Sequence, residues 1–122
     1  MKELSVVVVD DSVLVREHLK RAFAQIEGCT LIGMAADGAE GLTMIRALKP
    51  NIVVLDISMP HRNGIEVLRE IRKEDSEMLI IMFTSDSSVI LKEVCLEAGA
   101  NYYLDKTQIQ ELMEICKDLV KQ

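Results

Sequence analysis

Residues 6–12 read Val-Val-Val-Val-Asp-Asp-Ser, a short β-branched run that ends abruptly in two acids and a hydroxyl. Four consecutive valines favour a strand over a helix, because branching at Cβ restricts χ1 in a helix and suits a pleated surface. A run that is apolar at every position is typical of a strand that is covered on both faces of its sheet. The stretch therefore predicts a buried strand of a parallel sheet, with acidic side chains at its carboxyl end.

Similar runs at 31–35, 52–55, 79–83 and 102–104 alternate with stretches whose apolar residues recur at helical spacing. Five strand–helix repeats predict an α/β fold, a (βα)5 doubly wound parallel five-stranded sheet of order 2-1-3-4-5 in a flavodoxin-like three-layer sandwich. No Pro-, Gly- or Ser-rich linker interrupts the chain, so we expect one domain over 1–122 and find no output domain in it. The helical stripes are Val15, Leu19, Ala22, Phe23 and Ile26; Leu42, Ile45 and Leu48; Ile65, Leu68 and Ile71; Leu91, Val94, Cys95 and Ala98; and Ile109, Leu112, Met113, Cys116 and Val120.

The composition excludes several classes of protein. Fourteen basic against 20 acidic side chains give a formal charge of −6, and the aromatic residues are two Tyr and two Phe, so direct nucleic-acid binding is disfavoured. The apolar runs are far shorter than the about 20 residues of a membrane span, and the N-terminus lacks a secretory signal, so we expect no membrane segment and a cytoplasmic location. Three cysteines without CxxC spacing predict reduced thiols rather than a disulfide framework or a zinc site.

Polar residues follow four of the five predicted strands. Asp10 and Asp11 follow the first, Asp56 the third, Thr84 the fourth and Lys106 the fifth. Each has an ordinary explanation as well, since an acid can cap a helix or begin a turn, a threonine favours strands, and a lysine is usually solvated. Because the carboxyl ends of parallel strands share one rim of the sheet, we expect these side chains to converge there.

Three converging carboxylates repel one another, by about 4 kcal/mol per pair at 4 Å and moderate dielectric. A hard divalent cation offsets this repulsion, and Mg²⁺, with Mn²⁺ as an alternative, prefers oxygen ligands. Beside such a cation one carboxylate can attack phosphorus and form an acyl phosphate, while a lysine and a hydroxyl bind the phosphoryl oxygens. The pattern therefore favours phosphoryl chemistry at this rim.

At these residues the sequence resembles the response-regulator receiver domain of two-component signalling. The matching motifs are Asp10-Asp11-Ser12, the segment 55–60 with Gly64, Phe83-Thr84-Ser85 and Leu104-Asp105-Lys106. Their order and spacing extend the resemblance over residues 5–122. The resemblance implies that Asp56 is the phosphoacceptor and that Lys106 and Thr84 contact the phosphoryl group. It also implies a metal site whose ligands are Asp11, Asp56, the backbone carbonyl of Ser58 and, through water, Asp10.

The same resemblance implies a switch, in which Thr84 moves toward the phosphoryl group and Tyr103 turns from exposed to buried. Tyr102 is assigned to packing on the opposite face. The implied partners are a sensor histidine kinase or histidine phosphotransfer protein and an output protein bound by the face of the helix at 91–98, the strand at 102–104 and the helix at 109–120. Val89 and Ile90 either extend that face or form a buried helix start.

The domain would catalyse only its own phosphorylation and dephosphorylation, as a monomer or a phosphorylation-dependent dimer. Thr107 stands where the family usually has a cis-bonded proline, so we expect a trans bond after Lys106. His61 is expected to face solvent.

Other classes of protein with this fold are disfavoured by the residues after the first strand. A flavin protein would need a phosphate-cradling loop there, where this chain has two acids, and a haloacid-type phosphatase would need a DxD motif, which Asp10-Asp11-Ser12 does not provide. Two further alternatives are a phosphorylation-independent interaction module and the receiver fragment of a larger DNA-binding regulator.

Overall fold

The computed structural model describes residues 3–86 and 88–122. Five parallel strands form one sheet of order β2-β1-β3-β4-β5, which confirms the predicted doubly wound topology. The strands are β1 (Leu4–Val9), β2 (Cys29–Ala35), β3 (Ile52–Leu55), β4 (Leu79–Thr84) and β5 (Tyr102–Asp105). The helices are α1 (Val13–Phe23), α2 (Gly38–Leu48), α3 (Gly64–Glu74), α4 (Val89–Glu97) and α5 (Ile109–Lys121).

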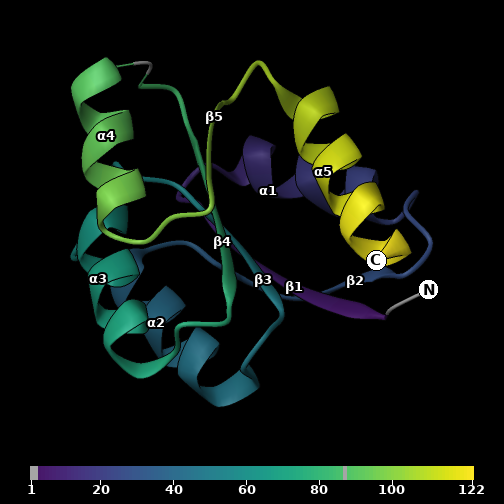
Figure 1. Cartoon of the computed structure of the whole chain (residues 1–122), viewed down its shortest axis with the longest axis horizontal. Helices are drawn as coiled ribbons and strands as arrows, with labels where there is room; N and C mark the ends of the chain where they lie inside the picture. The colour runs from purple at the N-terminus through teal and green to yellow at the C-terminus, as the bar shows by residue number, and fades with distance from the viewer. Residues whose placement is uncertain (1–2, 87) are drawn as a thin grey trace.

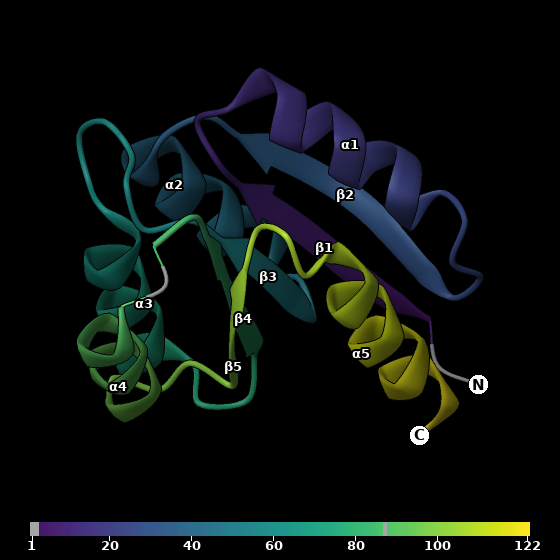
Figure 2. The same ribbon diagram turned by 90° about the horizontal axis from the view of Figure 1, so that it is seen from above.

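The sheet is the middle of three layers. Figures 1 and 2 show α1 and α5 on one face of the sheet and α2, α3 and α4 on the other. Side chains of a strand alternate between the faces, so Val6 and Val8 pack under α1 and α5 whereas Val7 and Val9 pack under α2 and α3. All four valines are fully buried, which is the physical reason for a strand without polar alternation.

Side-chain caps fix where the helices begin. The Ser12 hydroxyl accepts a 3.3 Å hydrogen bond from the Val15 N–H and caps α1, which leaves the neighbouring Asp11 carboxylate without that role. Asn63 caps α3 in a reciprocal capping box with Glu66. Within the described part of the chain, no helix is both long enough and apolar enough to span a bilayer.

The structure corrects two expectations from the sequence, for β2 and for Tyr102, and decides between the two alternatives for Val89 and Ile90. β2 begins at Cys29 rather than 31, and its pairing with β1 skips Ile32, an irregularity of the β-bulge type. Tyr102 is 38% exposed, so its assignment to packing is wrong: the last strand lies at the sheet edge and leaves this ring uncovered. Val89 and Ile90 are 70% and 72% exposed, which decides against a buried helix start.

Candidate functional site

Backbone hydrogen bonds extend the sheet ladder by one residue at its carboxyl edge and fix the predicted site residues there. The Asp10 N–H donates to the Ala35 carbonyl at 3.0 Å, and the Asp56 N–H donates to the Val9 carbonyl at 3.0 Å. The Lys106 N–H donates in the same way to the Thr84 carbonyl at 2.9 Å. The predicted rim therefore consists of residues at the ends of four neighbouring strands.

Lys106 joins two buried carboxylates across this rim. Its Nζ lies 2.8 Å from Asp10 Oδ2 and 3.0 Å from Asp56 Oδ2. Asp10 and Asp56 are only 2% and 4% exposed, whereas the lysine side chain is 20% exposed. Two buried acids thus share one ammonium, and acidic side chains outnumber basic ones at this site.

The other carboxylate oxygens bind backbone amides. Asp10 Oδ1 accepts from the Ser12 N–H at 2.9 Å, and Asp56 Oδ1 accepts from the Ile57 N–H at 2.8 Å. Arg16, in the first turns of α1, donates from Nη1 to the Asp10 backbone carbonyl at 2.6 Å. Each buried acid is held in one orientation, so the site is ordered before any ligand arrives.

Burial and pairing act in opposite directions on the charges. Burial raises the pKa of Asp10, and the hydrogen bonds from Lys106 and Ser12 only partly offset this effect. Burial, the largest single effect, disfavours the ammonium of Lys106, but the hydrogen bonds to Asp10 and Asp56 and the charges of these two acids together outweigh it, so the pKa of Lys106 is raised. Lys106 therefore remains a cation throughout the physiological range.

Asp11 completes an acidic cluster on the solvent side. One carboxylate oxygen from each of Asp10, Asp11 and Asp56 can be chosen so that all three lie within 4.8 Å of one another. Asp11 is exposed, while the other two acids are buried. Oxygen donors at this spacing suit a hard divalent cation that keeps part of its water shell. The donor set therefore fits the magnesium site that the sequence predicts, and Ser58 lies on the exposed loop beside it.

The two residues of the predicted switch meet at Asp86. Thr84 is buried at the end of β4, and its Oγ1 accepts a 3.3 Å hydrogen bond from the Asp86 N–H. Tyr103, half-buried on β5, donates from its hydroxyl to the Asp86 carbonyl at 2.7 Å. Both side chains are thus joined to one residue of the β4–α4 loop.

The loop after Asp56 is tightly built. The Gly64 N–H donates to the Ile57 carbonyl at 2.8 Å, and a Cβ on Gly64 would overlap the Asp56 carbonyl oxygen. His61 is exposed, as expected, and adopts a φ of 69° in a turn closed by a 2.8 Å hydrogen bond from the Arg62 N–H to the Pro60 carbonyl. The close approach of Gly64 to the Asp56 carbonyl oxygen explains why this loop requires glycine at its end.

The segment after Lys106 follows the expectation for a chain that lacks proline there. The peptide bond before Thr107 is trans, and the Thr107 N–H donates to Asp105 Oδ1 at 2.9 Å. Lys106 reaches both acids with this backbone. The residue that sequence reasoning missed is Arg16, because a side chain that binds a backbone carbonyl six positions earlier leaves no distinctive local pattern.

The family model of the response regulator receiver domain matches residues 6–117, and the chain belongs to this family. It is 37% identical over 117 residues to the response regulator MprA of Mycobacterium ulcerans, covering 95% of this chain and 50% of that protein. It is 35% identical over 124 residues to a protein-glutamate methylesterase/protein-glutamine glutaminase of Clostridium acetobutylicum, covering 99% of this chain and 36% of that protein. The chain thus spans half or less of the length of these curated relatives.

Solved structures agree with this assignment. The receiver domain of the NarL response regulator of Mycobacterium tuberculosis superimposes with a TM-score of 0.90 at 28% identity, covering 99% of this chain and 98% of that one. A chain of the CheX–CheY–BeF3–Mg²⁺ complex of Borrelia burgdorferi superimposes with a TM-score of 0.84 at 32% identity, covering 92% and 88%. Fold and family thus define a receiver domain of two-component response regulators.

Proposed function

We propose that this chain is a phosphorylation-activated signalling switch that accepts a phosphoryl group on Asp56 from a histidine kinase or a histidine phosphotransfer partner. The observation that carries the proposal is the ammonium of Lys106, held 3.0 Å from Asp56 Oδ2 and 2.8 Å from Asp10 Oδ2. A cation in this position holds the Asp56 carboxylate in place and then faces the oxygens of the incoming phosphoryl group.

The transfer makes one bond and breaks one. A carboxylate oxygen of Asp56 attacks the phosphorus of a phosphohistidine, the P–N bond breaks, and its electron pair returns to the imidazole ring of the donor. The product is an acyl phosphate on Asp56. Lys106 keeps its contact with Asp10 and binds a phosphoryl oxygen, so the ammonium need not be desolvated again during the reaction.

The metal ligands proposed for Mg²⁺, with Mn²⁺ as a substitute, are Asp11, Asp56, the Ser58 carbonyl and, through water, Asp10. The chemistry supplied by a bound cation is neutralisation of charge on the transferring phosphoryl oxygens. The approach of the three carboxylates within 4.8 Å supports this assignment, and so does the absence of a capping role for Asp11.

Activation would run through Asp86. The Thr84 hydroxyl donates to a phosphoryl oxygen and gives up the hydrogen bond that it now accepts from the Asp86 N–H. The loop then shifts the Asp86 carbonyl, and the Tyr103 hydroxyl that is bonded to it turns inward. This is a shift in population between two packings, driven by one new cluster of charge.

Output would be binding rather than turnover of a separate substrate. The surface we assign to it is the α4-β5-α5 face, where Val89, Ile90 and Tyr102 are exposed. We propose 1–122 as one receiver domain, a monomer or a phosphorylation-dependent dimer, whose partner is an output protein or an output domain. The chain covers half or less of the length of its curated relatives, so a receiver within a larger DNA-binding regulator is the alternative. Identifying the partner that this face binds distinguishes the two.

The deciding experiment is incubation with acetyl phosphate, with and without Mg²⁺, followed by intact mass measurement after an acid quench. We expect a Mg²⁺-dependent gain of one phosphoryl group in the wild type and none in Asp56→Asn. Asp105→Asn is the matched control, because Asp105 is an acid at a strand end whose carboxylate accepts a hydrogen bond from the Thr107 N–H of its own turn, and it should be phosphorylated normally. A folded wild type that gains no phosphoryl group from acetyl phosphate or from a phosphohistidine donor would overturn the proposal in favour of a phosphorylation-independent module.

A further inference from the structure

Arg16 binds the main chain at the point where β1 ends and the acidic cluster begins. From a half-buried position in the first turns of α1, its Nη1 donates to the Asp10 backbone carbonyl at 2.6 Å. The Asp10 N–H still bonds to Ala35, the last residue of β2, but the Asp10 carbonyl lies beyond the paired part of the two strands. A main-chain carbonyl at the end of a ladder needs another donor, and the guanidinium supplies it.

The bound carbonyl belongs to the peptide group that joins Asp10 to Asp11. Because a peptide group is planar, fixing its oxygen also fixes the direction in which the chain continues to the Cα of Asp11. The Asp10 side of this group is held separately, since its carboxylate accepts from the Ser12 N–H at 2.9 Å. Asp11 is exposed and does not cap α1, so the position of its carboxylate depends on the peptide group that Arg16 binds.

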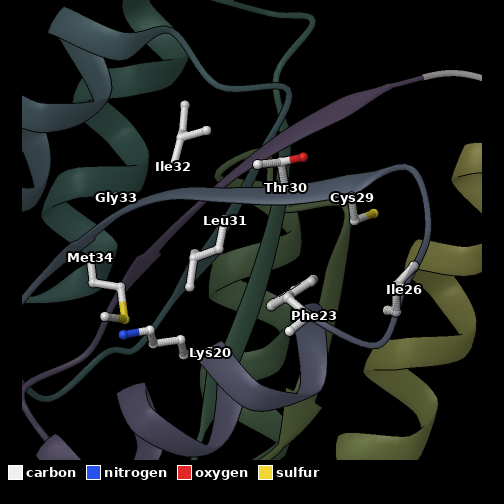
Figure 3. Close-up of a pocket in the computed structure, with 10 residues that line it drawn as sticks. Lys20, Phe23, Ile26, Cys29, Thr30, Leu31, Ile32, Gly33 and Met34 are labelled. Atoms are coloured by element: carbon white, nitrogen blue, oxygen red, sulfur yellow. The ribbon is translucent and has the colours of Figure 1, made fainter.

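The helix that carries Arg16 is anchored to the sheet. Leu19 and Phe23, which follow Arg16 on α1, are each only 1% exposed. Figure 3 shows Phe23 reaching from α1 toward β2 and Leu31 reaching from β2 toward α1. Helical side chains lean toward the N-terminus of their helix, which directs Arg16 to the β1–α1 turn. A donor on a packed helix holds the carbonyl more rigidly than a donor on a loop would.

We propose that Arg16 is a positioning residue for the metal site, which holds the Asp10–Asp11 peptide group so that the Asp11 carboxylate meets a divalent cation beside Asp56. This inference rests on the proposed function, because it concerns the cation assigned there to the three clustered acids. Arg16 acts through a main-chain carbonyl, whereas Lys106 contacts the carboxylates of Asp10 and Asp56 themselves. The two basic residues therefore have separate roles, one in placing a ligand and one in pairing with the buried acids.

Two effects of Arg16 on cation binding have opposite signs. The guanidinium repels a divalent cation, so if its charge were the main effect, removing Arg16 would tighten cation binding. Holding the Asp11 carboxylate in place favours the cation, so if positioning is the main effect, removing Arg16 weakens binding. Residues that orient metal ligands through hydrogen bonds typically change metal affinity by about 10–100-fold. The sign of the change in affinity therefore distinguishes positioning from charge.

The test measures cation binding directly, without phosphorylation. Mn²⁺ is titrated into the full chain, and the free ion is followed by its electron paramagnetic resonance signal. We expect Arg16→Met, which keeps an apolar stem on α1, to raise the Kd for Mn²⁺ about 10-fold. Arg16→Lys keeps the charge and a donor, so its Kd should fall between those of Arg16→Met and the wild type. Lys20→Met is the matched control, because Lys20 lies one turn later on α1 and lines the groove beside β2 (Figure 3), and it should bind Mn²⁺ as the wild type does.

A second measurement separates positioning from a general loss of structure. Phosphorylation by acetyl phosphate is followed at increasing Mg²⁺ concentration, and in Arg16→Met the half-saturating Mg²⁺ concentration should rise about 10-fold while the rate at saturating Mg²⁺ stays close to that of the wild type. A lower saturating rate with an unchanged half-saturating concentration would overturn the inference, and so would Mn²⁺ binding by Arg16→Met that equals or exceeds that of the wild type. A wild type that binds Mn²⁺ but gains no phosphoryl group would contradict the proposed function instead, and the Mn²⁺ titrations alone would then decide the role of Arg16.

Discussion

The Tyr103 hydroxyl and the Asp86 backbone carbonyl are joined by a 2.7 Å hydrogen bond that ties β5 to the β4–α4 loop. The N–H of Asp86 donates to Thr84 Oγ1 at 3.3 Å, so a single residue of the loop contacts both switch side chains. In the switch that we propose, a rotation of the Thr84 hydroxyl is accommodated at Asp86 and transmitted to Tyr103. This connection gives the proposed switch a physical path that can be tested by mutation.

Removing the Tyr103 hydroxyl should loosen the loop at a modest cost in stability. Tyr103→Phe deletes one hydrogen bond and keeps the ring, so we expect the free energy of unfolding to fall by about 1 kcal/mol in urea denaturation. The matched control is Tyr102→Phe, at an exposed position of the same strand, with a change of a few tenths at most. Equal losses in the two variants would contradict a specific role for the bond to Asp86.

Tyr103 should also titrate abnormally at high pH. Burial, followed by the nearby charge of Asp86, raises the pKa of Tyr103 to about 12. A folded-state pKa above the unfolded value near 10 means that this stabilising contribution is present below about pH 10 and is lost as pH rises toward 12. Ultraviolet absorbance after rapid pH jumps should show the late phenolate transition in the wild type and in Tyr102→Phe. Its persistence in Tyr103→Phe would refute the assignment.

Stability should depend on pH through Asp10. The folded state raises the pKa of Asp10 mainly by burial, so it binds the proton more tightly than the unfolded chain does, and this contribution is lost as pH rises through the folded pKa. Asp10→Asn has no such titration. The stability of the variant minus that of the wild type should therefore increase from acid to neutral pH, as measured by urea unfolding across the range. A difference that is constant with pH would count against a raised Asp10 pKa.

Replacing Gly64 by alanine should lower stability, although helix propensity alone predicts that it would raise it. Alanine favours helices over glycine, but a Cβ at this position would overlap the Asp56 carbonyl oxygen, which is rigid backbone. We expect Gly64→Ala to cost about 1–3 kcal/mol in chemical denaturation. In the control Gly33→Ala the nearest atom is Met44 Sδ at 2.7 Å, the end of a flexible side chain, so the cost should be smaller.

The strained turn at His61 can be relieved. Its φ of 69° is costly for a residue with a Cβ, whereas glycine adopts it freely. After the entropy cost of glycine is subtracted, His61→Gly should raise the free energy of unfolding by about 1 kcal/mol. Arg62→Gly, at the next exposed position without a positive φ, should lower stability instead. Thermal unfolding of the two variants, measured side by side, distinguishes local strain from a general effect of the loop.

Much of the fold follows from local patterns in the sequence. Continuous β-branched runs, such as the valines after Ser5, and apolar residues at helical spacing specify five strands and five helices, and their alternation specifies a parallel sheet. The polar residues that end these strands were identifiable for the same reason, since parallel strands bring their carboxyl ends to one edge. Boundaries were less accurate: the start of β2 depends on pairing with β1 rather than on composition.

The sequence by itself determined which elements form and which side chains reach the carboxyl edge, because hydrophobic periodicity and strand-end position are properties of short segments. Only the tertiary structure decided how those side chains are used: Lys106 pairs with Asp56 from 50 positions away, and Arg16 binds the Asp10 carbonyl across the β1–α1 turn. Tertiary packing likewise decided that Val89 and Ile90 remain exposed. Such contacts depend on the relative placement of packed layers and on side-chain orientation across them, and no local pattern encodes these distances.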